Sequence, residues 1–396
     1  MLMPRHLLLC TLLLLILGLA GQPLAAQDLR DFAYVDSLTL TLSGQERWAA
    51  LDSLGAAALR AGTDYPALRQ RLGYAALRQG HLVPAIRHYG QAVAANPTDE
   101  ESRTQLARAY LLVNEPGAAR LAVATLPDSV RQALHLPAHR AVTQVLVEGS
   151  GKPAANVRRE AAGFGRIGLS SQLSTRLALT QNLSYYEQAV RLPERRPTPA
   201  FFIRQREYAA LLTEQVSLSW QVKGAYHFVS NDYGPARYAN HLGFAAARFS
   251  RPGWSVQLSQ YVGRVTDTTR LQTDLQLLAY PLPSARLYVY GRASLIRSAG
   301  HTFPNALLGL GAQLSPRLAV EGFGSPGRVP VLFERDAIDV YNVLDPLRYR
   351  LGLNTYGQLS GHWRLHFSYL AARYQEIRTL TSYTQHSLTG GLLWTW

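Results

Sequence analysis

The sequence predicts an α + membrane β fold, in which N-terminal helical hairpins precede an antiparallel transmembrane β-barrel. Three observations predict it: a leader with the anatomy of a signal peptide, a helix-rich stretch, and an alternation of apolar and polar residues from about residue 141 to the last residue. We expect 14 barrel strands, with 12 as the fallback. The expected segments are a signal peptide over 1–26, a helical domain over 27–138 and the barrel over 139–396.

The first 26 residues have the three parts of an export signal. Arg5 supplies a basic start, residues 7–19 are apolar, and small residues end at Ala26. Because the apolar run is shorter than the roughly 20 residues of a membrane-spanning helix, we expect the leader to be removed. The single cysteine, Cys10, lies in the leader, so we expect no disulfide or thiol chemistry in the mature protein.

The formal net charge is +14, and almost all of the positive charge is arginine. A strongly basic chain raises the question of a nucleic-acid partner. The arginines, however, are scattered singly among the expected strands rather than clustered. We therefore expect no nucleic-acid partner and place these residues in the lumen or at the rims of the barrel.

Residues 43–136 are rich in Ala, Leu, Arg and Gln, which favour helices. One segment has the spacing of a tetratricopeptide (TPR) repeat, a pair of antiparallel helices with small residues where they meet. The residues expected to pack this pair are Leu72, Gly73 and Ala76 on the first helix, Ala85, Tyr89 and Ala92 on the second, and Pro97 after it. Such repeats stack on neighbours and form a concave surface, so we expect a periplasmic protein partner. The alternative is that the helices only plug or brace the mouth of the barrel.

The clearest strand covers residues 216–229. Apolar residues such as Trp220 and Val222 occupy alternate positions, and polar residues such as Lys223 and His227 lie between them. Because successive side chains of a strand point to opposite faces, one face suits lipid and the other suits water. Residues 254–262, 271–277 and 363–369 repeat the pattern.

Turn residues divide this region into short and long connections in alternation. Short turns are expected at 174–175, 213–215, 251–253, 281–284, 315–316 and 360–362, and longer loops at 192–199, 230–236, 265–269, 297–303, 325–346 and 377–384. Short turns at one end and longer loops at the other are typical of outer-membrane barrels. Each short turn joins two strands, which gives 12 strands. The C-terminal strand and a first strand near residues 141–148 bring the total to 14.

The last strand, residues 386–396, ends on an aromatic residue. Leu392, Trp394 and Trp396 lie on its apolar face and resemble the C-terminal signal that the barrel-assembly machinery reads. A soluble β-sandwich gives the same alternation. The leader, the strands of ten or more residues and the aromatic strand ends favour a lipid-embedded barrel in the outer membrane of a Gram-negative bacterium, with the helices in the periplasm.

The architecture resembles that of the YaiO-like outer-membrane proteins, in which a signal peptide and TPR-like helices precede a barrel with an aromatic end. The local segments that carry the resemblance are residues 206–208 (Arg-Glu-Tyr), 224–228 (Gly-Ala-Tyr-His-Phe) and 340–346 (Val-Tyr-Asn-Val-Leu-Asp-Pro). The resemblance implies a location and a fold, and it implies no particular substrate.

Several basic residues fall on inward positions of the expected strands. They are Lys223, Arg292, Arg348, Arg350 and Arg364. Because inward carboxylates are fewer, a narrow pore with this lining would favour anions. The alternative is that these residues pair with acids or with the helical domain and seal the lumen.

The sequence offers only weak candidates for catalysis. His366 and Ser368 lie two apart on one face of a strand, which places a hydroxyl beside an imidazole. The pair is similar to the His-x-Ser arrangement of outer-membrane lipid A deacylases, and Glu376 is the nearest candidate for the orienting acid. Two polar lumen residues would give the same pattern.

The longest expected loop contains Glu334, Asp336 and Asp339, which are candidates for a calcium site. Loop carboxylates are usually only solvated, so we expect no metal and no cofactor.

These observations together predict a non-enzymatic outer-membrane barrel with a periplasmic scaffold. It would act in envelope biogenesis, or in the transport or export of a solute or glycan. Two alternatives stay open: a lipid- or glycan-modifying enzyme that uses His366 and Ser368, and a sealed membrane anchor for the helices.

Overall fold

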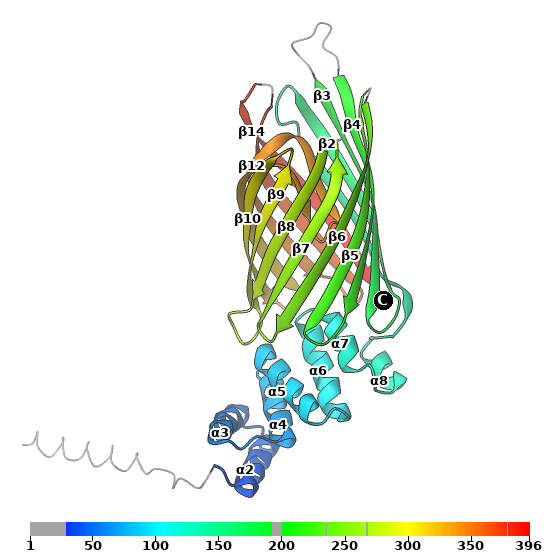
Figure 1. Ribbon diagram of the computed structural model, residues 1–396. Coiled ribbons are helices and arrows are strands. Elements are labelled where there is room, and N and C mark those ends of the chain that lie inside the picture. Colours follow the sequence, from blue (N-terminus) through cyan, green and yellow to red (C-terminus); the bar gives the residue numbers. More distant parts are fainter. Residues whose placement is uncertain (1–28, 192–199, 235, 267, 378) are drawn as a thin grey trace, which may run out of the picture.

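The computed structural model describes residues 29–191, 200–234, 236–266, 268–377 and 379–396. The expected signal peptide and the expected loop at 192–199 lie outside these residues. In the described part of the chain, seven helices stand against one end of a closed barrel (Figure 1). None of the described helices is long and apolar enough to cross a membrane. We refer to the end that carries the helices as the helical end and to the opposite end as the far end.

The barrel is one antiparallel sheet in which every strand pairs with its neighbours in sequence, and β1 pairs with β14 to close it. The strands are β1 (Arg140–Lys152), β2 (Arg159–Gln172), β3 (Leu177–Arg191), β4 (Ala200–Gln215), β5 (Trp220–Tyr233), β6 (Ala236–Arg251), β7 (Trp254–Val265), β8 (Thr268–Ala279), β9 (Leu287–Ser298), β10 (His301–Ser315), β11 (Leu318–Glu334), β12 (Asp339–Gln358), β13 (Trp363–Gln375) and β14 (Ser382–Thr395). The predicted fold class is confirmed, with 14 strands rather than 12.

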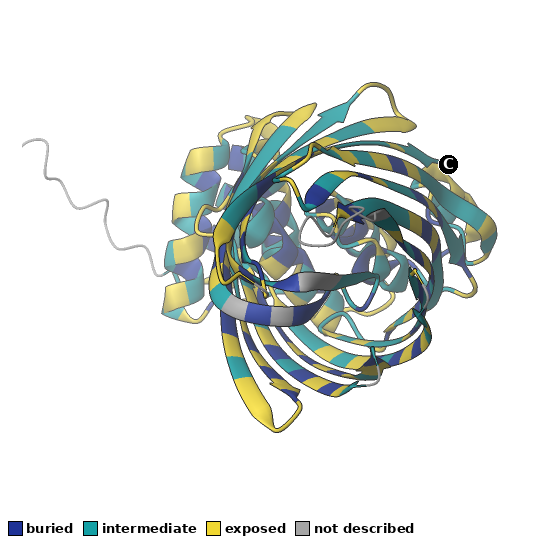
Figure 2. Ribbon diagram, turned by 90° about the horizontal axis from the view of Figure 1, so that it is seen from above, coloured by how far each residue is buried: buried dark blue, intermediate teal, exposed yellow. Residues whose placement is uncertain are grey.

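The outer face of the barrel is apolar and the inner face is polar. Leu258 and Leu275 are 58% and 54% exposed on the outside, whereas their inward neighbours Gln257 and Asp274 are 7% and 1% exposed. Figure 2 shows the resulting bands of exposed and buried residues along the strands. Because exposed apolar area costs about 25 cal/mol per Å² in water, an outer face of this kind suits lipid.

Tryptophans gather at the helical end of the barrel. Trp220, Trp254 and Trp363 begin their strands at this end, and Trp394 and Trp396 end the last strand there. Leu392 and Trp396 are 36% and 38% exposed, and the Trp394 ring lies 6.0 Å from that of Trp363. A belt of this kind is typical of the boundary between lipid and water.

Three connections at the far end are shorter than the sequence predicted. Segments expected as loops there continue as paired strands: positions 233 and 236, 265 and 268, and 298 and 301 face each other. The reason is that hydropathy marks the part of a strand that lies in lipid, whereas backbone pairing continues beyond it. At the helical end, the turn expected at 213–215 lies at 216–219, where Leu218 packs against the helices instead of lipid.

The helices form successive antiparallel hairpins. They are α2 (Phe32–Gly44), α3 (Trp48–Ala61), α4 (Pro66–Arg78), α5 (Leu82–Ala95), α6 (Glu100–Leu112), α7 (Pro116–Ala122) and α8 (Asp128–Ala133). Two apolar clusters fill the spaces between them. The packing residues of the expected repeat lie where α4 meets α5: Leu72, Ala76, Ala85, Tyr89 and Ala92 are at most 2% exposed. Pro97 follows α5 on the surface.

Gly73 allows α4 and α5 to approach closely. A Cβ atom at position 73 would lie 2.7 Å from the Tyr89 ring, and that ring is only 2% exposed. We expect Gly73→Ala to destabilise the helices by about 1–3 kcal/mol, the usual cost of overpacking. Thermal unfolding of the full chain in detergent, followed at 222 nm, measures it. Gly90→Ala on α5 is the matched control, because nothing lies within 4 Å of its added methyl group. An equal loss from both variants would contradict this packing.

We expect His88 to make the helices sensitive to acid. Burial, together with the Arg69 and Arg87 guanidinium groups, lowers the pKa of the His88 imidazole from 6.5 to about 4. Its Nδ1 accepts a hydrogen bond of 3.2 Å from Arg69, as a neutral ring can. Between these two pH values the unfolded chain binds the proton and the folded chain does not, so stability falls as the pH is lowered from about 6.5 to 4. We expect a loss of at most about 2 kcal/mol at pH 5.

The measurement for His88 is the same 222 nm transition, recorded at pH 7 and pH 5. We expect His88→Leu to reduce the difference between the two pH values, since the substituted side chain does not titrate. An unchanged difference in that variant would assign the acid sensitivity to other groups.

The helical domain braces the rim of the barrel. The Val83 backbone N–H at the start of α5 donates a 3.0 Å hydrogen bond to the Pro283 carbonyl between β8 and β9. Glu115, just before α7, pairs at 2.5 Å with Arg248 on β6. The bracing that the sequence left as an alternative is therefore part of the structure, and a surface for a partner stays a prediction.

Candidate functional site

A β-hairpin lies inside the barrel. The pairing of β11 with β12 runs regularly from Leu318 to Pro326, shifts register, and continues from Val331 to Glu334. The segment expected as the longest outer loop is thus a folded hairpin that bends from the far end into the lumen (Figures 1 and 2). We call residues 329–345 the lumen hairpin.

Apolar contacts fix one side of the lumen hairpin to the wall. Val331, Phe333 and Ala337 are at most 2% exposed and share a cluster with wall residues of β4 to β7. The Phe333 ring stacks on that of Tyr261, with centroids 5.8 Å apart. Gln272 of β8 binds the hairpin backbone twice: it accepts from the Phe333 N–H at 3.0 Å and donates to the Phe333 carbonyl at 2.8 Å. The Gln272 side chain therefore satisfies backbone groups of the hairpin that a neighbouring strand would otherwise bind.

Ion pairs fix the tip. The Glu334 carboxylate accepts from Arg350 at 2.6 Å and from Arg292 at 2.5 Å. Asp336 accepts from Lys223 at 2.6 Å and from Gln257 at 2.8 Å.

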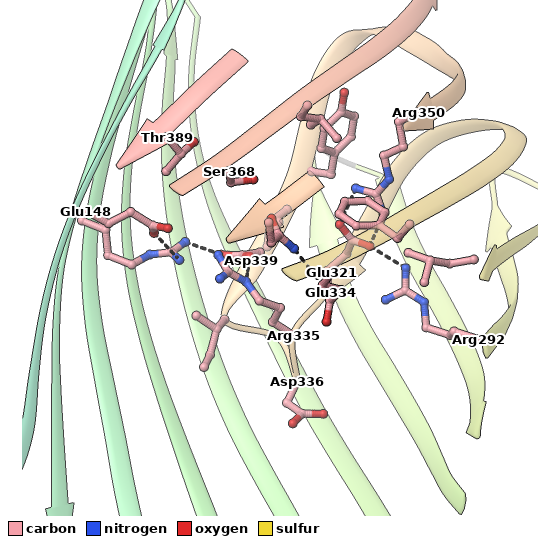
Figure 3. A pocket seen from close by; sticks show the side chains of 18 of the residues that line it. Glu148, Arg292, Glu321, Glu334, Arg335, Asp336, Asp339, Arg350, Ser368 and Thr389 are labelled. Carbon is pink, nitrogen blue, oxygen red and sulfur yellow. Dashed lines mark hydrogen bonds and ion pairs between the residues drawn. The ribbon is translucent and has the colours of Figure 1, made fainter. Parts of the chain in front are cut away.

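The third acid of the tip, Asp339, pairs with Arg166 of β2 and with Arg335 of the hairpin itself. Figure 3 shows Asp339 beside Arg335, and Glu334 between Arg292 and Arg350. The tip is thus tied to strands on opposite sides of the lumen.

The three calcium candidates of this segment have other partners in the structure. Glu334, Asp336 and Asp339 each bind a cationic side chain of the protein, and no cluster of three potential metal ligands occurs among the described residues. The physical reason is their place: these carboxylates lie in the lumen beside arginine and lysine, not in a solvated loop.

Three of the five basic residues predicted for the lumen, Lys223, Arg292 and Arg350, face the cavity and pair with the hairpin. The other two do not line it, which corrects the prediction. Arg348 is exposed, because a register shift between positions 347 and 349 displaces it from the inward alternation. Arg364 has inward parity but is exposed at the helical end, where it donates to Gln358 at 3.1 Å.

The lumen holds a cavity of about 800 Å³ around the hairpin. Seven basic side chains and six acidic ones line it: Lys152, Arg166, Lys223, Arg248, Arg292, Arg335 and Arg350, and Glu148, Glu207, Glu321, Glu334, Asp336 and Asp339. The charges nearly balance. The lining therefore gives no reason to expect strong anion selectivity. The arginines of the wall are paired with acids, as the alternative predicted.

His366 and Ser368 also line this cavity. The His366 ring stacks on Tyr356, with centroids 5.0 Å apart, and its Nδ1 is 3.6 Å from a Glu148 oxygen. Glu376, the expected orienting acid, instead lies 3.3 Å from Arg158 at the far end. The three residues are thus not brought together as a nucleophile, base and acid.

The three segments that carry the family resemblance meet around the hairpin. His227 of the second segment donates from Nδ1 to the Ala337 carbonyl at 2.7 Å, and its Nε2 lies 2.9 Å from Glu207 of the first segment. Asp345 of the third segment accepts from Arg159 at 2.8 Å and from the Tyr383 hydroxyl at 2.7 Å, at the base of the hairpin.

Sequence reasoning missed the wall residues that hold the hairpin, notably Arg166, His227 and Gln272. The available signal was the apolar run at 329–333, which is unusual for a solvated loop.

A closed barrel with an apolar outer face and a polar lumen defines the class of this protein, which has the fold of an outer-membrane β-barrel. No protein-family model matches the chain, and no curated protein matches it in sequence.

Among solved structures, the chain is similar to the Acinetobacter baumannii outer-membrane protein Omp33, with 8% identity over 64% of this chain and 99% of that chain and a TM-score of 0.39. It is similar to the Pseudomonas putida toluene transporter TodX, with 8% identity over 72% and 93% of the two chains and a TM-score of 0.44. A Pseudomonas aeruginosa FadL homologue matches with 10% identity over 64% and 90% and a TM-score of 0.43.

Proposed function

We propose that this protein is an outer-membrane channel for a polar solute or a glycan, whose passage the lumen hairpin narrows. The observation that carries the proposal is the hairpin itself: it lies across a polar cavity of about 800 Å³ and is fixed at its tip by ion pairs with the wall. A lumen lined by charged and amide side chains suits a solute that keeps its hydrogen bonds.

The way the hairpin is held supports a constriction that can move. Buried ion pairs generally add less stability than apolar side chains of the same volume, because desolvation offsets the attraction. A tip held by Glu334, Asp336 and Asp339 is therefore easier to release into water than an apolar plug.

The helical domain, in this proposal, lies in the periplasm and resembles a TPR stack that holds a protein partner. The support for this side is the sequence pattern: the helices stand at the end where short turns were predicted, and barrels of this class have short periplasmic turns. The YaiO-like resemblance and the aromatic last strand, with Leu392, Trp394 and Trp396 as the assembly signal, belong to the same proposal.

Planar-bilayer recording of the refolded full chain, and of the chain without residues 27–138, tests this function. We expect discrete, small, weakly selective currents from the full chain, because the lining charges nearly balance. A current that appears only after truncation would make the helices the plug. No current from either form would favour a sealed membrane anchor and overturn the channel proposal.

A further inference from the structure

Among the described carboxylates that line the cavity, Glu321 differs from the other five because it forms no ion pair. The other five lie within salt-bridge distance of a basic side chain: Glu148 and Asp339 pair with Arg166, Glu207 with His227, Glu334 with Arg350, and Asp336 with Lys223. Among the described residues, no basic nitrogen comes within 4.0 Å of Glu321. Its oxygens instead accept from neutral groups, the Tyr288 hydroxyl and the Asn354 amide, each at 2.9 Å. The charge of Glu321 is held in place without a counter-ion.

Glu321 lies on the helical side of the points where the hairpin tip meets the wall. Along β9, Tyr290 is two residues nearer the helical end than Arg292. Along β12, Asn354, which pairs with Glu321, is four residues nearer that end than Arg350. Figure 3 shows Glu321 among the side chains that line the lumen, together with Glu334 and Arg335. A solute that enters from the helical end therefore meets Glu321 before it meets the constriction.

An aromatic ring lies beside this carboxylate. Tyr290 faces the cavity, and its ring rests on Gly309 of the neighbouring strand: a Cβ atom there would lie 2.2 Å from the ring. Tyr290 is only half-buried and lines the cavity, so part of its ring is open to the lumen. Phe323 rests on Gly352 in the same way, and Arg350 already lies 5.7 Å from its centroid. The wall thus already binds one cation on a ring mounted in this way.

We propose that Glu321 and Tyr290 form a binding subsite for an organic ammonium group carried by the solute. The ring face and the carboxylate both attract a positive charge, and together they recognise an ammonium with adjoining carbon atoms. A hard metal ion fits poorly, since it needs more oxygen ligands than one carboxylate supplies. A neutral sugar could stack on the ring but would leave the Glu321 charge uncompensated, since its hydrogen-bond partners are neutral. The subsite deepens the proposed function, because it names the chemistry of the solute.

Isothermal titration calorimetry on the refolded full chain in detergent tests the subsite. The probes are a glucosamine trisaccharide and its fully N-acetylated counterpart, which share a backbone and differ in charge. We expect only the glucosamine form to bind measurably. Glu321→Gln should weaken its binding about tenfold, because one hydrogen bond to a charged group is worth roughly that factor. Tyr290→Ala should weaken it similarly, and Tyr290→Phe, which keeps the ring face, should not.

Tyr186→Phe is the matched control, since Tyr186 lines the same cavity from β3 and should leave binding unchanged. Equal binding of both trisaccharides, unaffected by Glu321→Gln, would make the site a neutral sugar platform and overturn the proposal. No binding of the glucosamine form to folded protein would overturn it as well. Calorimetry does not depend on conductance. A chain that binds the glucosamine form but does not conduct would therefore overturn the channel proposal and not the subsite.

Discussion

Replacing residues 329–344 by an Asn-Gly turn is expected to raise the single-channel conductance several-fold. The change removes the apolar side of the lumen hairpin, with Val331, Phe333 and Ala337, together with its charged tip. Asp345 stays, so its contacts with Arg159 and Tyr383 are kept. Since conductance rises with the free cross-section of the lumen, removing a hairpin that spans it should have the largest effect of any change. Planar-bilayer recording measures it.

The control for this deletion places the same turn where it changes nothing in the lumen. Ala299 and Gly300 join β9 to β10 at the far end, are exposed, and have φ of +48° and +78°. Asn-Gly adopts such angles readily, so this variant should conduct like the unmodified chain. If the hairpin deletion yields folded barrels with unchanged current, the lumen hairpin is not the constriction.

The second large effect is expected from Glu334→Gln. This change leaves Arg292 and Arg350 without the carboxylate that both bind. Removing one partner of a buried ion pair costs about 3–5 kcal/mol, and the hairpin can relieve that cost by leaving the wall. We expect longer or more frequent openings in bilayer recordings. We also expect a shift toward anions, since Arg350 then loses its carboxylate and Arg292 keeps only Asp274, at 4.0 Å.

An exposed ion pair of the same barrel provides the control. Glu187 on β3 lies 2.7 Å from Arg204, and both side chains are more than a third exposed. Pairs of this kind contribute at most about 1 kcal/mol, so Glu187→Gln should leave gating and selectivity unchanged. Identical recordings from the Glu334 and Glu187 variants would show that the tip ion pairs do not hold the constriction.

The barrel could be predicted from the sequence because its strands obey a simple rule. Lipid on one side and water on the other require apolar and polar residues to alternate. The face on which a residue such as Leu258 or Asp274 lies therefore follows from its position in the strand. The number of strands followed from counting the turns. The strand ends did not, because backbone pairing at the far end continues through polar residues that also suit loops.

The site could be predicted only in part. Lys223, Arg292 and Arg350 follow the alternation, so the sequence placed them inward. Their partners could not be found, because Glu334 and Asp336 lie on a segment that leaves the wall and crosses the lumen. That path depends on contacts between residues far apart in sequence, which a period of two does not encode. The same holds for Arg348, where one register shift cancels the alternation.

Hydrogen exchange of the segment 331–341, followed by mass spectrometry on the full chain in lipid nanodiscs, tests the central claim most directly. The claim is that this segment is a fixed hairpin inside the barrel, with the Phe333 N–H bound to Gln272 and the Ala337 carbonyl bound to His227. It predicts slow exchange of the Phe333 amide and of the paired amides of the hairpin, comparable to that of the neighbouring wall strands. Complete exchange within seconds, as in a solvated outer loop, would contradict the claim and leave the lumen without its constriction.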